Sequence, residues 1–242
     1  MKKLRIQYNS PVVLSFALLA LLVLLLGRLT GGWTTRALFC VYRAPLTDPL
    51  TYVRMVGHVL GHSGYAHYMG NMTLLLVIGP PLEEKYGSGR LLGCILFTAL
   101  VSGLVQFIFF PGTALLGASG IVFMMIVLSS LAGMREGAIP LTLILVVLIY
   151  LGGEIVDAVT VRDNVSQLTH IVGGLCGAGL GFSMKKTRPF HSKTPAVRQY
   201  RTAGFLSALS VVPLGFVLQH RAGGRVDLIV ILLAAAVKLH IV

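Results

Sequence analysis

The sequence predicts an all-α polytopic membrane protein from three observations: an apolar composition, several long apolar runs and an uneven distribution of basic residues. Of the 242 residues, 55% are hydrophobic and only 12% are charged, and the mean hydropathy is +0.85. A water-soluble globular domain does not need this much apolar surface. Several runs reach the length of about 20 residues with which a helix crosses a bilayer. We therefore expect one continuous helical domain in a membrane.

Six membrane spans are predicted in chain order, at residues 11–29, 66–82, 90–110, 118–134, 138–156 and 166–184. A basic start precedes the first span, but no small-residue cleavage site follows it, so we interpret this span as retained rather than as a signal peptide. The six spans form a domain over residues 11–184. The other segments are predicted as a basic N-terminus, an outer loop, a basic linker and C-terminal hydrophobic segments, at residues 1–10, 30–65, 185–202 and 203–242. We interpret the last segment as an appended hydrophobic hairpin.

The basic residues predict the orientation of the chain. The formal net charge is +12, and most basic residues fall in connections that are cytoplasmic if the N-terminus is cytoplasmic. The outer connections 110–117 and 157–165 contain one basic residue between them, Arg162. This pattern indicates topology and contact with lipid headgroups rather than binding to nucleic acid. We expect a multi-pass protein of a prokaryotic plasma (inner) membrane. The scattered cysteines form neither a disulfide framework nor a zinc spacing: Cys40, Cys94 and Cys176.

Polar residues gather at the start of three predicted spans. Spans two, four and six run in the same direction, so their N-terminal ends share one depth near the outer face. Span two opens with His67 and Asn71, which lie on one face of a helix. Span four opens with Ser119, and span six carries His170 about one turn inside its start. Polar groups in lipid are costly and usually face the bundle interior, where they have a function.

Ser119 lies in a small-residue turn at a predicted helix start. The positive end of the helix dipole and unpaired backbone N–H groups surround a hydroxyl at this position. Gly117 and Gly120 remove side-chain bulk beside it, so that a substrate or a second backbone can come close. Taken alone, such a serine more often caps a helix or packs against a neighbour. Its coincidence in depth with the histidines favours nucleophilic catalysis.

His170 is followed by small residues at helical spacing. Gly173, Gly177 and Gly181 form a ridge that permits close approach of another helix. We expect the ridge to bring span six against span four, which would allow His170 to reach Ser119 and act as its general base. A leucine at Gly177 is expected to separate the two helices and to reduce activity and thermal stability together, and an alanine is expected to have a much smaller effect.

His67 and Asn71 are then available to donate hydrogen bonds to an oxyanion. Each polar residue taken singly also permits a structural role. A buried histidine often bonds only a carbonyl, and an asparagine often only ties helices together.

These residues together resemble the rhomboid family of intramembrane serine proteases. The similarity spans about residues 10–185 and rests on four segments and two polar positions. The first segment is HSGYAHYMGNM at 62–72, which is similar to the family's H-x4-H-x3-N motif, and the second is EEKYGS at 83–88. The third is GASG at 117–120, which is similar to the family's G-x-S-G motif, and the fourth is His170-x2-Gly173-x3-Gly177. The two polar positions are Ser102 and Gln106.

The resemblance implies a rhomboid-like bundle of six transmembrane helices with a serine–histidine dyad. Ser119 is implied as the nucleophile and His170 as the general base, while His67, Asn71 and the Ser119 N–H form the oxyanion hole. Phe123 stands where members often have tyrosine, and it is expected to stack on His170. No cofactor is implied. The implied substrates are single-pass membrane proteins, cleaved near the outer end of their helix.

The acidic residues near span six do not predict a third member of this dyad. Glu154 ends span five, and Asp157 and Asp163 lie in the outer connection that follows. None of them is expected at the level of His170 on a neighbouring helix.

Two other functions compete with proteolysis. One is a catalytically inactive rhomboid-like protein that binds membrane helices, and the presence of both dyad residues weighs against it. The other is a metal transporter or metalloprotease built on His58, His62 and His67. No H-E-x-x-H motif, nearby carboxylate or thiol accompanies these histidines, so we expect no metal. His62 is expected to support the fold of the outer loop.

Overall fold

The computed structural model of the protein describes residues 8–132, 141, 144–145, 148 and 164–184. The α-helices whose ends lie in this part of the chain are α1 (Pro11–Leu29), α2 (Trp33–Leu38), α3 (Pro49–Gly57), α4 (Tyr65–Tyr86), α5 (Ser88–Phe109), α6 (Ser119–Ala132) and α8 (Asn164–Met184), and one 3-10 helix, η1 (His58–Leu60), lies between α3 and α4. The described residues contain no β-strand, only an isolated bridge between Val41 and Leu115.

The all-helical bundle confirms the predicted fold class. The first predicted span coincides with α1, and the second, third, fourth and sixth overlap α4, α5, α6 and α8. The sequence predicts only a loop over 30–65, whereas the structure has α2, α3 and η1 there. The fifth predicted span at 138–156 lies largely outside the described residues, as do Glu154, Asp157, Asp163 and the segments 1–7 and 185–242.

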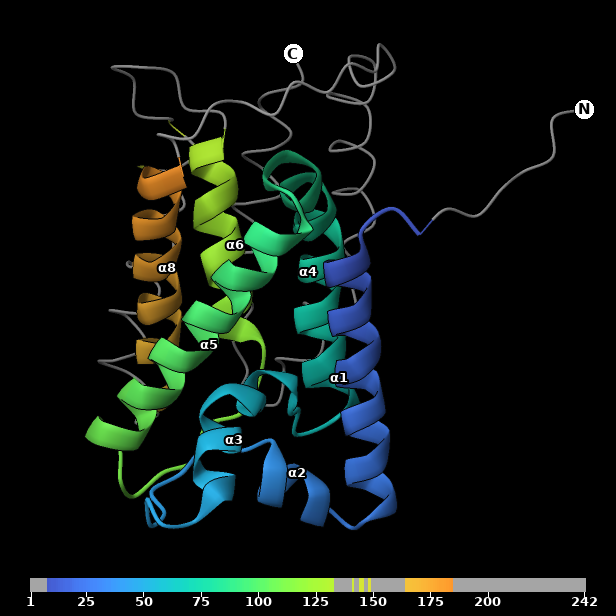
Figure 1. The fold of residues 1–242 in the computed structure, drawn as a ribbon, viewed down its shortest axis with the longest axis vertical. Helices are drawn as coiled ribbons and strands as arrows, with labels where there is room; N and C mark the ends of the chain where they lie inside the picture. The colour runs from blue at the N-terminus through green and yellow to red at the C-terminus, as the bar shows by residue number, and fades with distance from the viewer. Residues whose placement is uncertain (1–7, 133–140, 142–143, 146–147, 149–163, 185–242) are drawn as a thin grey trace, which may run out of the picture.

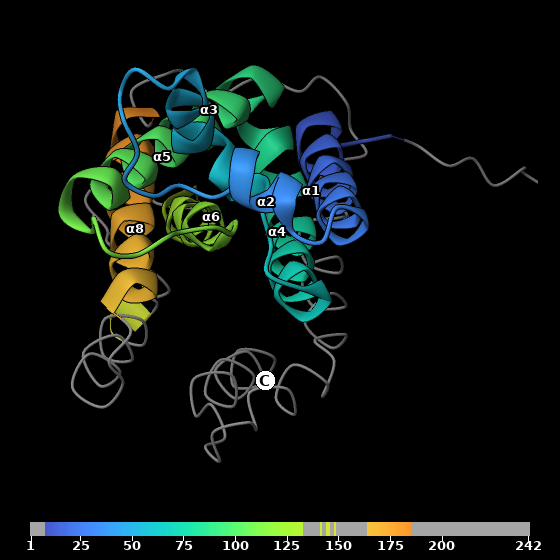
Figure 2. The same cartoon turned by 90° about the horizontal axis from the view of Figure 1, so that it is seen from below.

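The directions of the helices bring three N-terminal ends together. Helices α4, α6 and α8 run in one direction, and α1 and α5 run in the opposite one (Figure 1). Helices α2 and α3 lie at the end of the bundle where α4, α6 and α8 begin. Seen from that end, α6 lies between α8 and α4 and contacts both (Figure 2). The start of α6 is therefore flanked by the starts of two parallel helices.

The surface of the bundle is strongly apolar. Large side chains such as Leu18, Phe97 and Leu175 are 50–68% exposed. Such a surface is unfavourable in water and natural against lipid chains. Helices α1 and α5 are long and apolar enough to cross a membrane by length and composition, whereas α6 and the 168–184 part of α8 are apolar but shorter. Helix α4 is as long as α5, but His67 and Asn71 near its start and Glu83 near its end lower its hydropathy.

A glycine ridge joins α8 to α6. A Cβ atom added to Gly173 would overlap the carbonyl oxygen of Gly120, and one added to Gly177 would lie 2.5 Å from the carbonyl oxygen of Met124. A Cβ on Gly181 would lie 2.6 Å from Cδ1 of Leu131. At Gly173 and Gly177 the contacts are with backbone and leave no room for a side chain, whereas at Gly181 the contact is with the flexible end of a leucine. The two helices thus pack at the closest distance that their backbones allow.

Glu83 caps the N-terminal end of α1, although it lies about seventy residues later in the sequence. Its two carboxylate oxygens accept hydrogen bonds from the backbone N–H groups of Val12 (2.9 Å) and Val13 (3.0 Å), and Ser88 Oγ donates to it at 2.7 Å. Ser10, at the N-cap of α1, makes no side-chain cap. A carboxylate there satisfies N–H groups that the helix leaves unpaired, and it complements the helix dipole. Glu83 therefore fixes the start of α1 to the end of α4.

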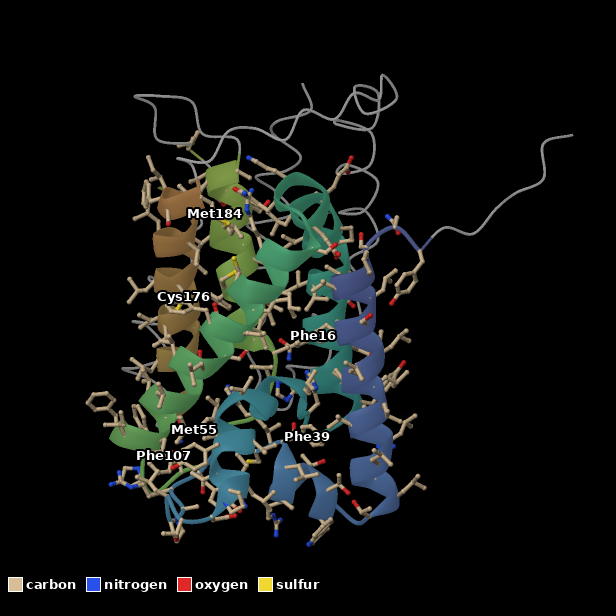
Figure 3. All side chains as sticks on the ribbon, viewed as in Figure 1. Phe16, Phe39, Met55, Phe107, Cys176 and Met184 are labelled. Carbon is tan, nitrogen blue, oxygen red and sulfur yellow. The ribbon has the colours of Figure 1, made fainter. Side chains whose placement is uncertain are left out.

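Arg54 organises the outer segment. Its side chain is buried, its Nε donates to the carbonyl oxygen of Ala37 at 2.8 Å, and it forms an ion pair with Asp48 at 3.0 Å. The guanidinium also lies 4.8 Å from the centre of the Tyr42 ring. A small apolar cluster joins this segment to the end of α5: Val41, Met55, Phe107 and Leu115. Figure 3 labels two of its members, Met55 of α3 and Phe107 of α5. The short helices α2 and α3 are thus held by contacts with distant parts of the chain.

Candidate functional site

Ser119 is the first residue of α6, and the turn before it is held by the outer segment. The N–H of Gly117 donates to the carbonyl oxygen of His58 at 3.0 Å. Two residues earlier, Leu115 and Val41 exchange two backbone hydrogen bonds of 2.9 Å. The hydroxyl of Ser119 is half-buried, next to N–H groups of the first helical turn that have no intrahelical partner. A nucleophile at this position has backbone donors beside it.

Gly117 makes room for the side chain of His67. Its φ of +126° is a conformation that residues with side chains rarely adopt. A Cβ added there would lie 2.8 Å from both Cε1 and Nε2 of His67, and 4.0 Å from Nδ2 of Asn71. The imidazole edge and the amide therefore both lie against the turn, two residues before Ser119. The structure brings these three predicted site residues together.

His67 and Asn71 are held by local hydrogen bonds on α4. Asn71 is 8% exposed, and its Nδ2 donates to the carbonyl oxygen of His67 at 3.1 Å. Nδ1 of His67 lies 3.1 Å from Oγ of Ser63. Since Nδ1 is engaged away from Gly117, Nε2 is the nitrogen that His67 presents to the turn.

His170 reaches the same region from α8. Its ring stacks on Phe123, with centroids 4.2 Å apart and planes inclined by 4°. Phe123 lies four residues after Ser119, about one turn further along α6. Gly173, which overlaps Gly120 if given a Cβ, is one turn beyond His170. The imidazoles of His170 and His67 are close enough to interact electrostatically. The stacking expected for Phe123 is present.

Helix α5 adds polar groups next to this turn. Ser102 is buried, and its Oγ would lie 3.4 Å from a Cβ on Gly120. Gln106, one turn further along, is also buried and donates from Nε2 to Oγ1 of Thr113 at 2.9 Å. Buried polar groups of this kind commonly bind ordered water.

His58 and His62 are buried in the outer segment. Burial lowers the pKa of His58 to about 4. Burial and, secondly, the repulsion that a protonated His67 would exert lower the pKa of His62 to about 4. Both imidazoles are therefore neutral at neutral pH. The ring of His62 meets that of His67 edge to face, with centroids 5.0 Å apart, so it supports that side chain. Among the residues that the structure describes, no group of three histidines, cysteines or carboxylates is arranged to hold a metal.

Three residues of the site and its frame are not predicted by the sequence analysis: Ser63, Arg54 and Glu83. Ser63 precedes His67 by four residues, the spacing of side chains that meet on a helix, although Ser63 itself lies just before the start of α4. Arg54 follows Asp48 by six residues, and their pairing depends on the fold of the outer segment. Glu83 stands in the last turn of α4, where a negative charge is unfavourable to its own helix dipole. That conflict, together with the place of Glu83 in the family-like segment 83–88, is a sequence signal that its carboxylate serves another helix, but neither signal identifies α1 as that helix.

Comparisons with known proteins place these residues in a family. Residues 49–187, more than half of the chain, match the Rhomboid family, described as "Rhomboid domain". This range contains every candidate site residue. The chain is 30% identical over 161 residues to "Rhomboid-related protein 2" of Mus musculus, covering 57% of this chain and 53% of that relative. It therefore spans about half the length of the mouse protein.

Two bacterial relatives extend the similarity. The chain is 27% identical over 189 residues to "Rhomboid protease GlpG" of Pectobacterium atrosepticum, covering 76% of this chain and 67% of that protein. It is 28% identical over 171 residues to "Rhomboid protease GluP" of Bacillus subtilis, covering 67% of this chain and 33% of that protein.

Proposed function

The chain belongs to the rhomboid family, and on that premise we propose that it is an intramembrane serine endopeptidase. Its substrates are single-pass membrane proteins, whose transmembrane helices it cleaves near the outer face. Two bacterial relatives named as rhomboid proteases support the reaction class. The observation that carries the proposal is the meeting of three parallel helix starts around the turn at Ser119, with His67, Asn71 and the stacked His170 beside it.

Ser119 is the proposed nucleophile and His170 its general base. Oγ of Ser119 attacks the scissile carbonyl carbon while His170 accepts the hydroxyl proton. The resulting oxyanion receives hydrogen bonds from Nε2 of His67, Nδ2 of Asn71 and the N–H of Ser119. When the C–N bond breaks, His170 returns the proton to the leaving amine. Water then hydrolyses the acyl-enzyme, again with His170 as the base.

The chain is an integral membrane protein, as its family and its apolar helices indicate. We place it in the plasma (inner) membrane of a prokaryotic cell, with the N-terminus in the cytoplasm. The positive-inside pattern supports this orientation. The site then lies near the outer face, where water reaches it most easily. A substrate helix must unwind locally there, because its carbonyl groups are engaged in i→i−4 hydrogen bonds.

The test is cleavage of a model transmembrane substrate by purified protein in liposomes. We expect the parent to cut it, and Ser119→Ala and His170→Ala each to abolish cutting. Ser130→Ala is the matched control, because Ser130 lies near the far end of α6 and its Oγ donates to the carbonyl oxygen of Ile126 within the helix. Undiminished cutting by Ser119→Ala contradicts the proposal. A folded parent that binds such helices but cuts none of them favours the inactive binding protein.

A further inference from the structure

We propose that Ser63 is a positioning residue that fixes the proton of His67 on Nε2, so that this nitrogen donates a hydrogen bond at the site. The consequence for catalysis rests on the proposed function, whereas the position of the proton does not. Ser63 lies outside the candidate catalytic residues, in the loop directly before α4.

The two nitrogens of His67 face different groups. Nδ1 lies 3.1 Å from Oγ of Ser63, and Nε2 lies against Gly117 in the turn before Ser119. The edge-to-face contact with His62 restrains the plane of the ring. The ring is therefore held in one orientation, and the remaining variable is which nitrogen carries the proton.

The chemistry of the partner at Nδ1 determines which protonation states of the ring can be stabilised there. A neutral imidazole has one donor and one acceptor nitrogen, and the hydrogen bond at one nitrogen sets the role of the other. The neighbouring His62 shows the opposite case, because its Nδ1 lies 3.1 Å from the carbonyl oxygen of Leu60. A carbonyl only accepts, so His62 is protonated on Nδ1. A hydroxyl also donates, so Ser63 is able to hold Nδ1 of His67 as an acceptor and leave the proton on Nε2.

The neighbouring His170 requires this arrangement of His67. A cationic His67 would also donate from Nε2, but its charge would oppose the positive charge that His170 gains when it deprotonates Ser119. A neutral His67 protonated on Nδ1 would direct a lone pair at the oxyanion. The neutral form with the proton on Nε2 avoids both conflicts, and a hydroxyl donor at Nδ1 stabilises that form.

The direct measurement is ¹⁵N NMR of the histidine rings in the full chain in detergent micelles. The shifts of the two ring nitrogens identify the protonated one, and His67→Gln identifies the signals of His67 by their loss. We expect protonation on Nε2 in the parent, a shift of the population towards Nδ1 in Ser63→Ala, and recovery in Ser63→Thr, which keeps the hydroxyl. Unchanged ring shifts in Ser63→Ala overturn the proposal.

Cleavage kinetics test the catalytic consequence separately. We expect kcat of Ser63→Ala to fall about fivefold, the effect of one typical hydrogen bond, with KM unchanged and kcat restored in Ser63→Thr. Ser130→Ala again serves as the control. A population shift without a change in kcat refutes the role of Ser63 in catalysis. If the parent itself does not cleave, the proposed function fails, while the NMR result still decides the position of the proton.

Discussion

The ring of Phe123 lies face to face on the imidazole of His170, with 4.2 Å between the centroids and 4° between the planes. Phe123 belongs to α6 and His170 to α8, so the stack joins the two helices within a turn of Ser119. It constrains the plane of the imidazole while the nitrogens remain at the edge of the ring. Together with the backbone contact of Gly173 on Gly120, it sets the depth and the plane of His170.

Replacing Phe123 by leucine is expected to reduce kcat about fivefold with little change in KM. An aromatic contact of this kind is generally worth about 1 kcal/mol, and here its loss lets the base rotate away from its reactive plane. Phe123→Tyr keeps the stack and should retain most of the activity. Phe97→Leu is the control, because Phe97 is 50% exposed on α5. Parental kcat in Phe123→Leu would show that stacking does not orient the base.

Alanine at Gly177 is expected to lower thermal stability and cleavage rate together. The sequence predicts a much smaller effect for alanine than for leucine at this position, and the 2.5 Å distance from an added Cβ to the carbonyl oxygen of Met124 indicates that even alanine disturbs the contact. A backbone carbonyl cannot rotate away as a side chain does, so α8 must shift from α6, at a cost of about 1–3 kcal/mol.

Gly179→Ala is the matched control for this substitution. Gly179 lies on the same helix, and an added Cβ meets no atom within 4 Å. Melting temperature and cleavage rate are measured for both variants. Equal values for Gly177→Ala and Gly179→Ala would mean that the glycine ridge does not hold the dyad together.

Asn71→Ala and His67→Ala are expected to slow turnover more than they disturb folding. Each removes a donor aimed at developing negative charge, an effect of about 3 kcal/mol, or roughly a hundredfold in kcat, in other acyl-transfer enzymes. We expect the smaller loss for His67, because Asn71 and the Ser119 N–H remain. Met69→Ala on the exposed side of α4 is the control. Parental kcat in both variants, with unchanged melting, would remove these residues from the oxyanion hole.

Glu83→Gln is expected to lower the free energy of unfolding by about 2 kcal/mol, because the amide offers one acceptor where the carboxylate offers two. One of the N–H groups of Val12 and Val13 then loses its partner. The neighbouring Glu84 is exposed, so Glu84→Gln is the control. The measurement is melting in detergent at constant pH. Equal melting temperatures for the two variants would show that this carboxylate does not anchor α1.

The sequence is informative about the bundle and the site because the relevant signals are local. Apolar runs give the spans, and the polar starts of α4, α6 and α8 identify the end of the bundle that carries the site. The spacing of Gly173 and Gly177 predicts the contact with α6, because small residues four apart lie on one face. Rhomboid family membership, inferred from these motifs, is confirmed by the match over residues 49–187.

The features that the sequence does not predict depend on distant contacts. Helices α2 and α3 have only six and nine residues, too short to be stable alone, and Arg54 holds them through Ala37 and Asp48. The hydrogen bonds of Glu83 to Val12 and Val13 connect residues about seventy positions apart. The short distance from an alanine Cβ at position 177 to the carbonyl oxygen of Met124 follows only from the relative positions of the α6 and α8 backbones.

The most direct test of the central claim, that Ser119 is a nucleophile activated by His170, is covalent labelling with a fluorophosphonate followed by peptide mass spectrometry. Such reagents phosphonylate an activated serine and leave ordinary hydroxyls unmodified. We expect one adduct, on Ser119, and a labelling rate at least about a hundredfold lower in His170→Ala, because loss of a general base generally has an effect of that size. Ser130 in the parent is the internal control and should remain unlabelled. An adduct on a residue other than Ser119, or undiminished labelling of Ser119 in His170→Ala, would contradict the dyad.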